Sequence, residues 1–349
     1  MNLPELVAFV MWIGLTLYVV FGGADFGAGF WDLVAGRGRR GAKQRALIEH
    51  VIGPVWEANH VWIIFVVVTL WSAFPKAFAS IMATLYLPWT AVAIGIILRG
   101  SAFAFRKTAV SFESMRSFGA VFASSSVITP FFLGTIAGAV ASGRVPVDGP
   151  GDVVQSWWNP TSVLAGVLAV TTAAFLAAVF LACEARRRGD DELVEVFRRR
   201  GLVSAAVAGV LALAGIAVLA SDAPALFEGL TARGWPLIGV SVLGGAGALV
   251  SLAGRRWRAA RVGAVVAVVA VLWGWAFGQY PWMLEDSLTI ADAAGHPATL
   301  RAMLIGLGVG AVLFVPPLVA LLVLSNRAEL EMEGGLDLIF EDDEARLRE

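Results

Sequence analysis

A carboxylate, an amide and an imidazole occur together at residues 56–62, which read WEANHVW. Glu57 and His60 are three residues apart, so a helix would place both on one face, with Asn59 beside them. A carboxylic acid and an imidazole can each accept a proton and hand it on, and an amide can hold either group by a hydrogen bond. These residue types favour the passage of protons.

The elements that must position these residues are membrane-spanning helices. Of the 349 residues, 58% are hydrophobic and only 15% are charged, which is more apolar than the surface of a soluble domain allows. A helix needs about 20 apolar residues to cross a bilayer, and the apolar runs lack the period-two alternation of a β-barrel. We predict an all-α integral membrane protein with about nine spans, at residues 6–33, 51–72, 78–100, 118–140, 161–183, 202–220, 236–253, 262–280 and 301–324.

The basic residues predict the orientation of the chain. Short loops rich in Lys and Arg remain on the cytoplasmic side of a membrane. Taken in alternation from the first connection, the loops assign nearly all 26 basic residues to one side. The N-terminus is therefore expected outside and the C-terminus in the cytoplasm. The exceptions are Lys76, Arg144, Arg233 and Arg301.

Ionisable residues within spans are functional candidates by default, because each costs about 2.5–3.5 kcal/mol on insertion scales. At 1.5 Å per residue, Asp25, Glu57 and His60 share a depth of roughly 9–13 Å from the cytoplasmic side, where the third helix carries Arg99. Asp25 and Arg99 could equally form a structural pair between helices. The spacing of Gly23 and Gly27 is typical of close helix packing.

The numbers of cysteines and histidines and the net charge limit which cofactors and partners the chain can have. The single cysteine, Cys183, cannot form a cysteine metal cluster, and three histidines leave little scope for a multi-histidine metal site. His60 is the one candidate haem ligand within a span, although a hydrogen-bonded interior histidine is the more frequent case. The net charge of −1 gives no indication of nucleic-acid binding.

Several motifs occur in the order of a known family. The first three predicted helices contain GGADFGAGFWDL, IGPVWEANHVW, FPKAFA and LRGSAFAFR, and residues 278–304 read GQYPWMLEDSLTIADAAGHPATLRAML. In this order they resemble subunit II of the cytochrome bd quinol oxidases, over most of the chain. Several motifs in one order are more specific than any one of them alone.

The resemblance implies an architecture. A single membrane domain over residues 1–349 is expected to contain two pseudo-repeated four-helix bundles, helices 1–4 at about 1–141 and helices 5–8 at about 160–281. One peripheral helix at about 301–324 and an acidic cytoplasmic tail at 325–349 would follow.

The resemblance also implies a complex in the bacterial cytoplasmic (inner) membrane. A homologous subunit I is expected to hold haems b and d, to oxidise quinol and to reduce oxygen to water. This chain is expected to hold no haem or metal, to support the complex and to contribute to proton delivery from the cytoplasm. The resemblance leaves room for a small accessory subunit and for a structural quinone or lipid.

The chain departs from the family pattern at four places. Gly22 and Ala104 stand where the family usually has an aspartate and a glutamate, and His60 replaces another glutamate. Glu57 replaces the aspartate of the proton path and keeps its ionisable group, so that function is carried over to Glu57.

Our hypothesis is that Glu57 is the leading proton carrier, with His60 and Asp25 as relay or electrostatic partners. Asn59 and Arg99 would support them by hydrogen bonds, and no residue is expected to be catalytic by itself. One alternative is a stand-alone secondary transporter or proton channel, although such folds favour broken helices near the midplane of the membrane. Another is a structural subunit whose polar residues only fix helix register.

Overall fold

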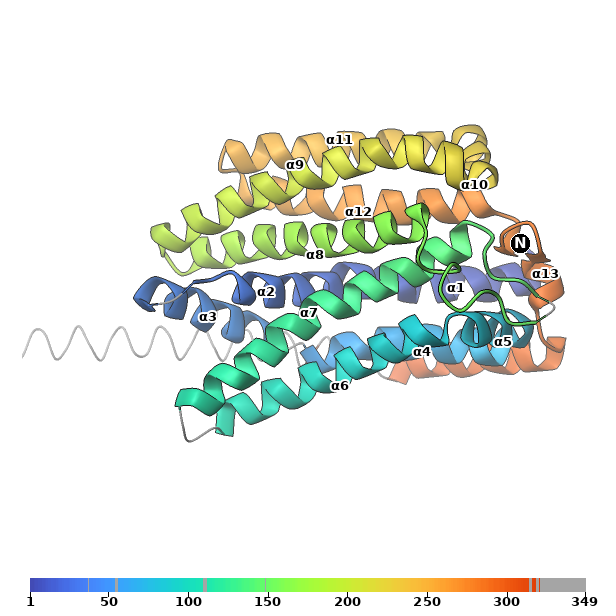
Figure 1. The fold of residues 1–349 in the computed structure, drawn as a ribbon, viewed down its shortest axis with the longest axis horizontal. Helices are drawn as coiled ribbons and strands as arrows, with labels where there is room; N and C mark the ends of the chain where they lie inside the picture. Colours follow the sequence, from blue (N-terminus) through green and yellow to red (C-terminus); the bar gives the residue numbers. More distant parts are fainter. Residues whose placement is uncertain are drawn as a thin grey trace, which may run out of the picture. The chain divides into compact units, whose positions relative to one another are not determined.

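The computed structural model describes residues 1–36, 38–53, 56–108, 112–147, 149–313, 316–317 and 320. The chain divides into two units, residues 1–295 and 296–349. The first unit is built from α-helices, with two π-helical turns and one β-hairpin. Its long helices run side by side along one direction (Figure 1).

The first half of this unit begins with a long helix that is interrupted by a π turn and continues to the basic connection predicted from the sequence. That connection is helical over α3. The elements are α1 (Leu3–Leu17), η1 (Tyr18–Gly22), α2 (Gly23–Leu33), α3 (Gly38–Ile52), α4 (Trp56–Ala73), α5 (Pro75–Thr84), α6 (Tyr86–Thr108) and α7 (Phe112–Ala141).

The second half contains four long helices and a small hairpin. The two strands pair antiparallel, with Trp282 opposite Thr289. The elements are α8 (Pro160–Arg187), α9 (Asp191–Asp222), α10 (Pro224–Gly229), η2 (Leu230–Gly234), α11 (Trp235–Ala253), α12 (Trp257–Gln279), β1 (Trp282–Leu284), β2 (Leu288–Thr289) and α13 (Ile290–Ala293).

Local sequence explains how the first long helix starts and where it widens. Asn2 and Glu5 form a capping box, in which each side chain accepts a hydrogen bond from the backbone N–H of the other. At the π turn, the N–H of Gly23 donates to the carbonyl of Tyr18, five residues earlier. Such a turn realigns the helix and is frequent at functional sites.

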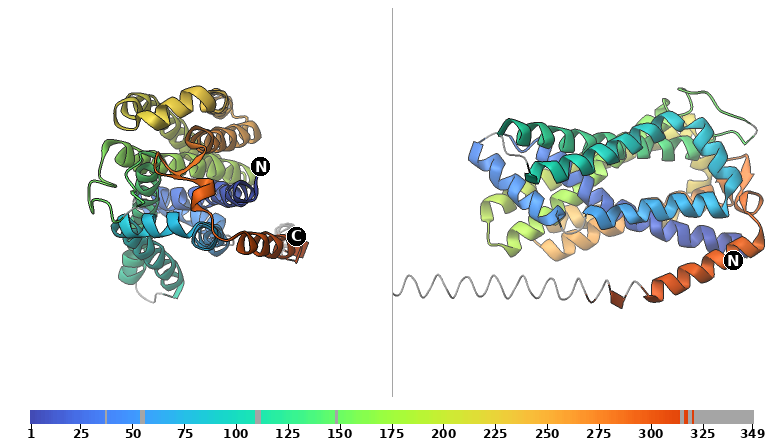
Figure 2. Two further views of the ribbon diagram at one scale, coloured as in Figure 1. Left: turned by 90° about the vertical axis from the view of Figure 1, so that its right-hand side faces the viewer. Right: turned by 90° about the horizontal axis from the view of Figure 1, so that it is seen from below.

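Helix α8 lies at the centre of the first unit, where it packs against α2, α7, α9 and α12. Small residues allow this contact, because a Cβ on Gly27 would collide with the backbone of Ala173, and one on Gly134 with the backbone of Ala165. The helices α9 and α11 lie on the side of α8 away from α4 and α6 (Figures 1 and 2). This arrangement fits the two expected bundles, whose repeat relation stays a prediction.

Eight helices in the described part of the chain are long and apolar enough to cross a membrane, and they follow the first eight predicted spans in order. The second predicted span was placed too early, because the Gly-Pro step at 53–54 separates α3 from α4. In the second unit, Pro297–Leu313 forms a shorter apolar helix. Most of the rest of the predicted ninth span and the whole tail at 325–349 lie outside the described residues. The total of nine spans stays a prediction.

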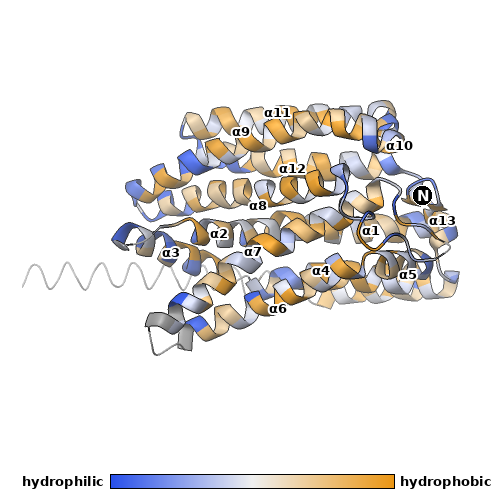
Figure 3. Ribbon diagram, viewed as in Figure 1, coloured by the Kyte–Doolittle hydropathy of each residue, from blue (hydrophilic) through white to orange (hydrophobic). Residues whose placement is uncertain are grey.

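Polar residues gather at the two ends of the first unit, and apolar residues cover the lengths of its helices (Figure 3). At one end, ion pairs join α3 to the start of α9 and the residue before it, including Arg40 with Glu192 and Lys43 with Asp190. This basic end is the one predicted to face the cytoplasm, and the orientation itself stays a prediction.

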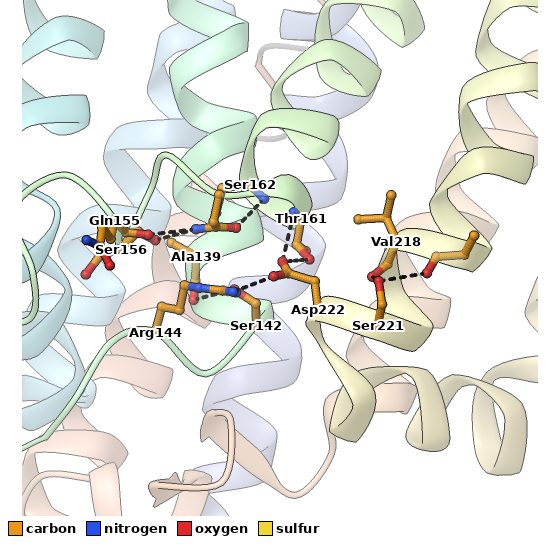
Figure 4. A network of polar contacts seen from close by, with 12 residues as sticks. Ala139, Ser142, Arg144, Gln155, Ser156, Thr161, Ser162, Val218, Ser221 and Asp222 are labelled. Atoms are coloured by element: carbon orange, nitrogen blue, oxygen red, sulfur yellow. Dashed lines mark hydrogen bonds and ion pairs between the residues drawn. The ribbon is translucent and has the colours of Figure 1, made fainter.

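A polar network at the opposite end joins α7, α8 and α9 (Figure 4). Asp222 at the end of α9 accepts hydrogen bonds from Arg144 Nη2 at 2.6 Å and from the backbone N–H of Thr161 at 3.0 Å. The Thr161 hydroxyl donates to the same carboxylate at 2.5 Å. Asp222 therefore fixes the ends of three spans with one side chain.

Asp222→Ala should lower the free energy of unfolding by about 1–3 kcal/mol, because a partly buried guanidinium and a backbone N–H lose their acceptor. Asp191→Ala is the matched control, since its ion pair with Arg186 is largely exposed and such pairs contribute little. Thermal unfolding of both variants in detergent measures the difference. Equal losses of stability in the two variants would contradict the assignment.

Candidate functional site

An ion pair between Asp25 and Arg99 connects α2 with α6 inside the first unit. Arg99 Nη1 donates to Asp25 Oδ2 over 2.9 Å, and Nη2 donates to Oδ1 over 2.7 Å. Arg99 Nη2 also reaches the carbonyl oxygen of Asp25, and Nε donates to Ser126 Oγ at 2.9 Å. The two side chains are only 2% and 1% exposed. Each guanidinium nitrogen therefore has an acceptor, as a buried charge requires.

Aromatic rings enclose this guanidinium. Arg99 Cζ lies 4.9 Å from the centre of the Phe26 ring and 4.7 Å from that of Phe122. Such contacts are favourable for a desolvated cation. The interhelical pair between Asp25 and Arg99, one of two alternatives from the sequence, is thus present in the structure.

His60 on α4 is packed beside this pair. Its ring lies 6.0 Å from the ring of Phe26 and 6.4 Å from that of Trp56, measured between centroids. Both ring nitrogens are shielded from solvent and have no hydrogen-bond partner among the described residues. The Phe26 ring contacts Arg99 as well, so this ring connects His60 with the ion pair. The structure therefore brings three of the predicted residues together.

Asn59 and Glu57 occupy different surroundings. Asn59 is buried, and its side-chain amide donates to the carbonyl of Phe21 in the π turn at 3.4 Å. Glu57 lies exposed in the first turn of α4, where the helix dipole favours a carboxylate. Three residues turn a helix by about 300°, so roughly 60° separates Glu57 from His60. Glu57 lies at the exposed edge of their shared face and His60 at the buried edge.

A second buried carboxylate, Asp32, was missed in the sequence. Its Oδ1 lies 2.9 Å from Arg45 Nε, and its Oδ2 lies 3.0 Å from Arg106 Nη1. Asp32 follows Asp25 by seven residues, and Arg106 follows Arg99 by seven. Two ion pairs with the same spacing, Asp25–Arg99 and Asp32–Arg106, therefore join α2 to α6, and we call each pair a rung. The equal spacing was the signal available in the sequence.

At the end of the unit opposite the basic one, Glu285 lies between the two strands of the hairpin. The residue is 6% exposed, and its Oε2 has no hydrogen-bond partner in the described part of the chain. Burial, together with repulsion by Asp286, raises the pKa of Glu285 to about 7, against the opposing charge of Arg233. Glu285 was also missed in the sequence, where only the motif at residues 278–304 indicated its segment.

The side chains of the described residues limit where a metal or haem could bind. Within them, no group of three or more His, Cys, Asp and Glu side chains is placed to hold a metal ion. The ring of His60 is enclosed by aromatic side chains and both its nitrogens are covered. His60 therefore does not fit a haem ligand in this packing.

Comparison with known proteins gives consistent matches. Residues 3–324 match the family described as cytochrome bd terminal oxidase subunit II. A Bacillus subtilis (strain 168) protein named as subunit II of a cytochrome bd menaquinol oxidase is 22% identical over 305 residues, which are 84% of this chain and 87% of that protein. Subunit 2 of the cytochrome bd-I ubiquinol oxidase of Escherichia coli (strain K12) is 27% identical over 61% of this chain and 59% of its own. The fold resembles that of the bd oxidase from Geobacillus thermodenitrificans, with a TM-score of 0.74 at 23% identity, over 92% of this chain and 98% of that chain.

Replacing one partner of the Asp25–Arg99 pair should lower the stability of the chain more than replacing both partners. Asp25→Asn and Arg99→Met each leave one charge buried without its partner, so each should lower the free energy of unfolding by about 3–5 kcal/mol. The double variant should lose clearly less than the sum of the two single losses. Thermal unfolding of the four proteins measures this coupling, and additive losses would show that the pair does not act as a unit.

Glu285 should make the stability of the chain depend on pH. The folded-state pKa of Glu285, about 7, lies above the ordinary value of 4.5 for a glutamate, so stability should fall as pH rises from about 4.5 to 7 and then level off. Glu285→Gln stays uncharged and should remove this loss, which makes the variant more stable than the parent at pH 8 but not at pH 4.5. Melting temperatures across this range test the expectation, and parallel curves for the two proteins would refute it.

Proposed function

The chain belongs to the cytochrome bd terminal oxidase subunit II family, and from this premise we propose that it carries protons from the basic end of its helices toward a haem-bearing subunit I. It is a multi-pass membrane subunit of a quinol oxidase, an oxidoreductase complex that implies a partner subunit. The comparisons give no support to a stand-alone transporter.

The observation that carries the proposal is the position of Glu57. It begins an exposed stripe on α4 that continues through Val61, Ile64, Val68 and Trp71. A carboxylate at the head of an apolar membrane face is costly toward lipid, but it is accommodated where a partner or a polar path covers it. We assign this stripe to the contact with subunit I, with Glu57 at the cytoplasmic margin as the proton entrance.

His60 is the next group along this path. It lies three residues farther along α4, which is roughly 4.5 Å deeper in the membrane. An imidazole can accept a proton on one nitrogen and release one from the other. Asp25 is held by Arg99 through two hydrogen bonds, so we assign it an electrostatic role beside His60.

The remaining parts of the complex follow from the family. Subunit I would hold haems b and d, which supply electron transfer and oxygen reduction, and it would oxidise the quinol. The complex would lie in the bacterial cytoplasmic (inner) membrane, where a small accessory subunit can join it.

A groove on the surface between α6 and α7 suits a structural quinone or lipid. It has a volume of about 460 Å³, and its walls include Gly95, Leu98, Val121 and Ile128. The lining is almost entirely apolar, so the matching ligand part is an isoprenoid or acyl chain.

Glu57→Gln should slow oxygen reduction by about tenfold or more, because the amide cannot take up a proton, while the complex still assembles. The matched control is Glu228→Gln, an exposed glutamate toward the opposite end of the unit. Oxygen consumption per haem in the purified complex measures the effect. Full turnover in well-assembled Glu57→Gln complex would refute the proposal.

A further inference from the structure

Tyr18 carries a buried hydroxyl that is not part of the route proposed above through Glu57 and His60. The residue opens the π turn and is 5% exposed. Its hydroxyl oxygen is inaccessible to solvent and has no hydrogen-bond partner among the described residues. Leaving such a group without a partner lowers stability, so buried hydroxyls of this kind bind water or serve a function.

The surroundings of this hydroxyl are those of the candidate site. The Tyr18 ring meets the Phe26 ring edge-on at 6.3 Å, and Phe26 also borders His60 and Arg99. Tyr18, His60 and the ion pair are thus grouped around one aromatic ring.

Tyr18 is the deepest member of this group. It precedes Asp25 by seven residues in a helix that runs toward the basic end, which places it roughly 10 Å farther from that end. Tyr18 therefore lies farther from the expected proton source than Glu57, His60 and Asp25, which share a similar depth.

The π turn and Gly22 hold the ring in this place. A Cβ on Gly22 would lie 3.0 Å from two atoms of the Tyr18 ring. The ring therefore packs over a residue that has no side chain, at the position where the family usually has an aspartate. Asn59 donates to Phe21 in the same turn, which ties the turn to α4.

We propose that the Tyr18 hydroxyl is the innermost proton-carrying group of this chain, an inference that rests on the proposed function. A water molecule on the His60 side gives a proton to the hydroxyl oxygen while the hydroxyl gives its own proton to a second water on the opposite side, so one O–H bond forms as another breaks. Rotation of the O–H then restores the starting state, so no charge or bond changes overall.

The test uses the purified complete oxidase with Tyr18→Phe, which removes only the oxygen. Oxygen consumption should fall about tenfold, and the ratio of rates in H₂O and D₂O should rise, because proton transfer becomes limiting. The matched control is Tyr280→Phe, which removes a hydroxyl bonded to Glu5 at the far end of the unit and should leave turnover unchanged. Melting temperature and haem absorbance are recorded for both, and Glu57→Gln is measured in parallel.

The outcomes separate the two proposals. Slow turnover of Tyr18→Phe with a raised isotope ratio, unchanged haem and an unchanged or higher melting temperature supports the inference. Full turnover of Tyr18→Phe while Glu57→Gln is slow overturns this inference alone. Full turnover of both variants overturns the proposed function as well. Slow turnover with a lower melting temperature or lost haem overturns the inference in favour of a structural role.

Discussion

Two buried salt bridges between α2 and α6 determine how the polar part of this chain is arranged. Asp25 pairs with Arg99, and Asp32 pairs with Arg106, with the same separation along both helices. A charge in apolar surroundings requires its partner at short range, so each rung fixes the register of α2 against α6. The Phe26 ring is held against Arg99 as a result, and it in turn places Tyr18 and His60.

The same constraint explains what the sequence could predict. Spans are set by local hydropathy, and the first eight were found in order because lipid selects composition over about 20 residues. Asp25 and Arg99 were recognised as candidates because a charge within an apolar run is rare. Their pairing remained one of two alternatives, since it depends on which helices are neighbours.

The parts that sequence missed depend on tertiary structure. The Asp32–Arg106 rung needs α2 and α6 in parallel contact, although the repeated spacing of seven was visible. The exposure of Glu57 depends on where the buried face of α4 ends. The π turn at Tyr18 follows from a hydrogen bond between Gly23 and Tyr18, and no residue pattern indicated it. Tyr18 and Glu285 could not be singled out from the sequence. Each is distinguished by a buried oxygen that has no hydrogen-bond partner among the described residues, and burial depends on tertiary structure.

The charge balance of this core explains which of its groups can move a proton. The Asp25 carboxylate and the Arg99 guanidinium compensate each other's charge in an apolar site, so each is held by its partner. The departures at Gly22 and Ala104 remove two carboxylates that would add charge near these rungs. What remains beside the Asp25–Arg99 rung are His60 and Tyr18, which have no fixed charge and whose ring nitrogens and hydroxyl are unpartnered. The ion pair therefore fixes the charge at this site, and in the proposed route a proton that enters at Glu57 travels through the groups that no salt bridge holds.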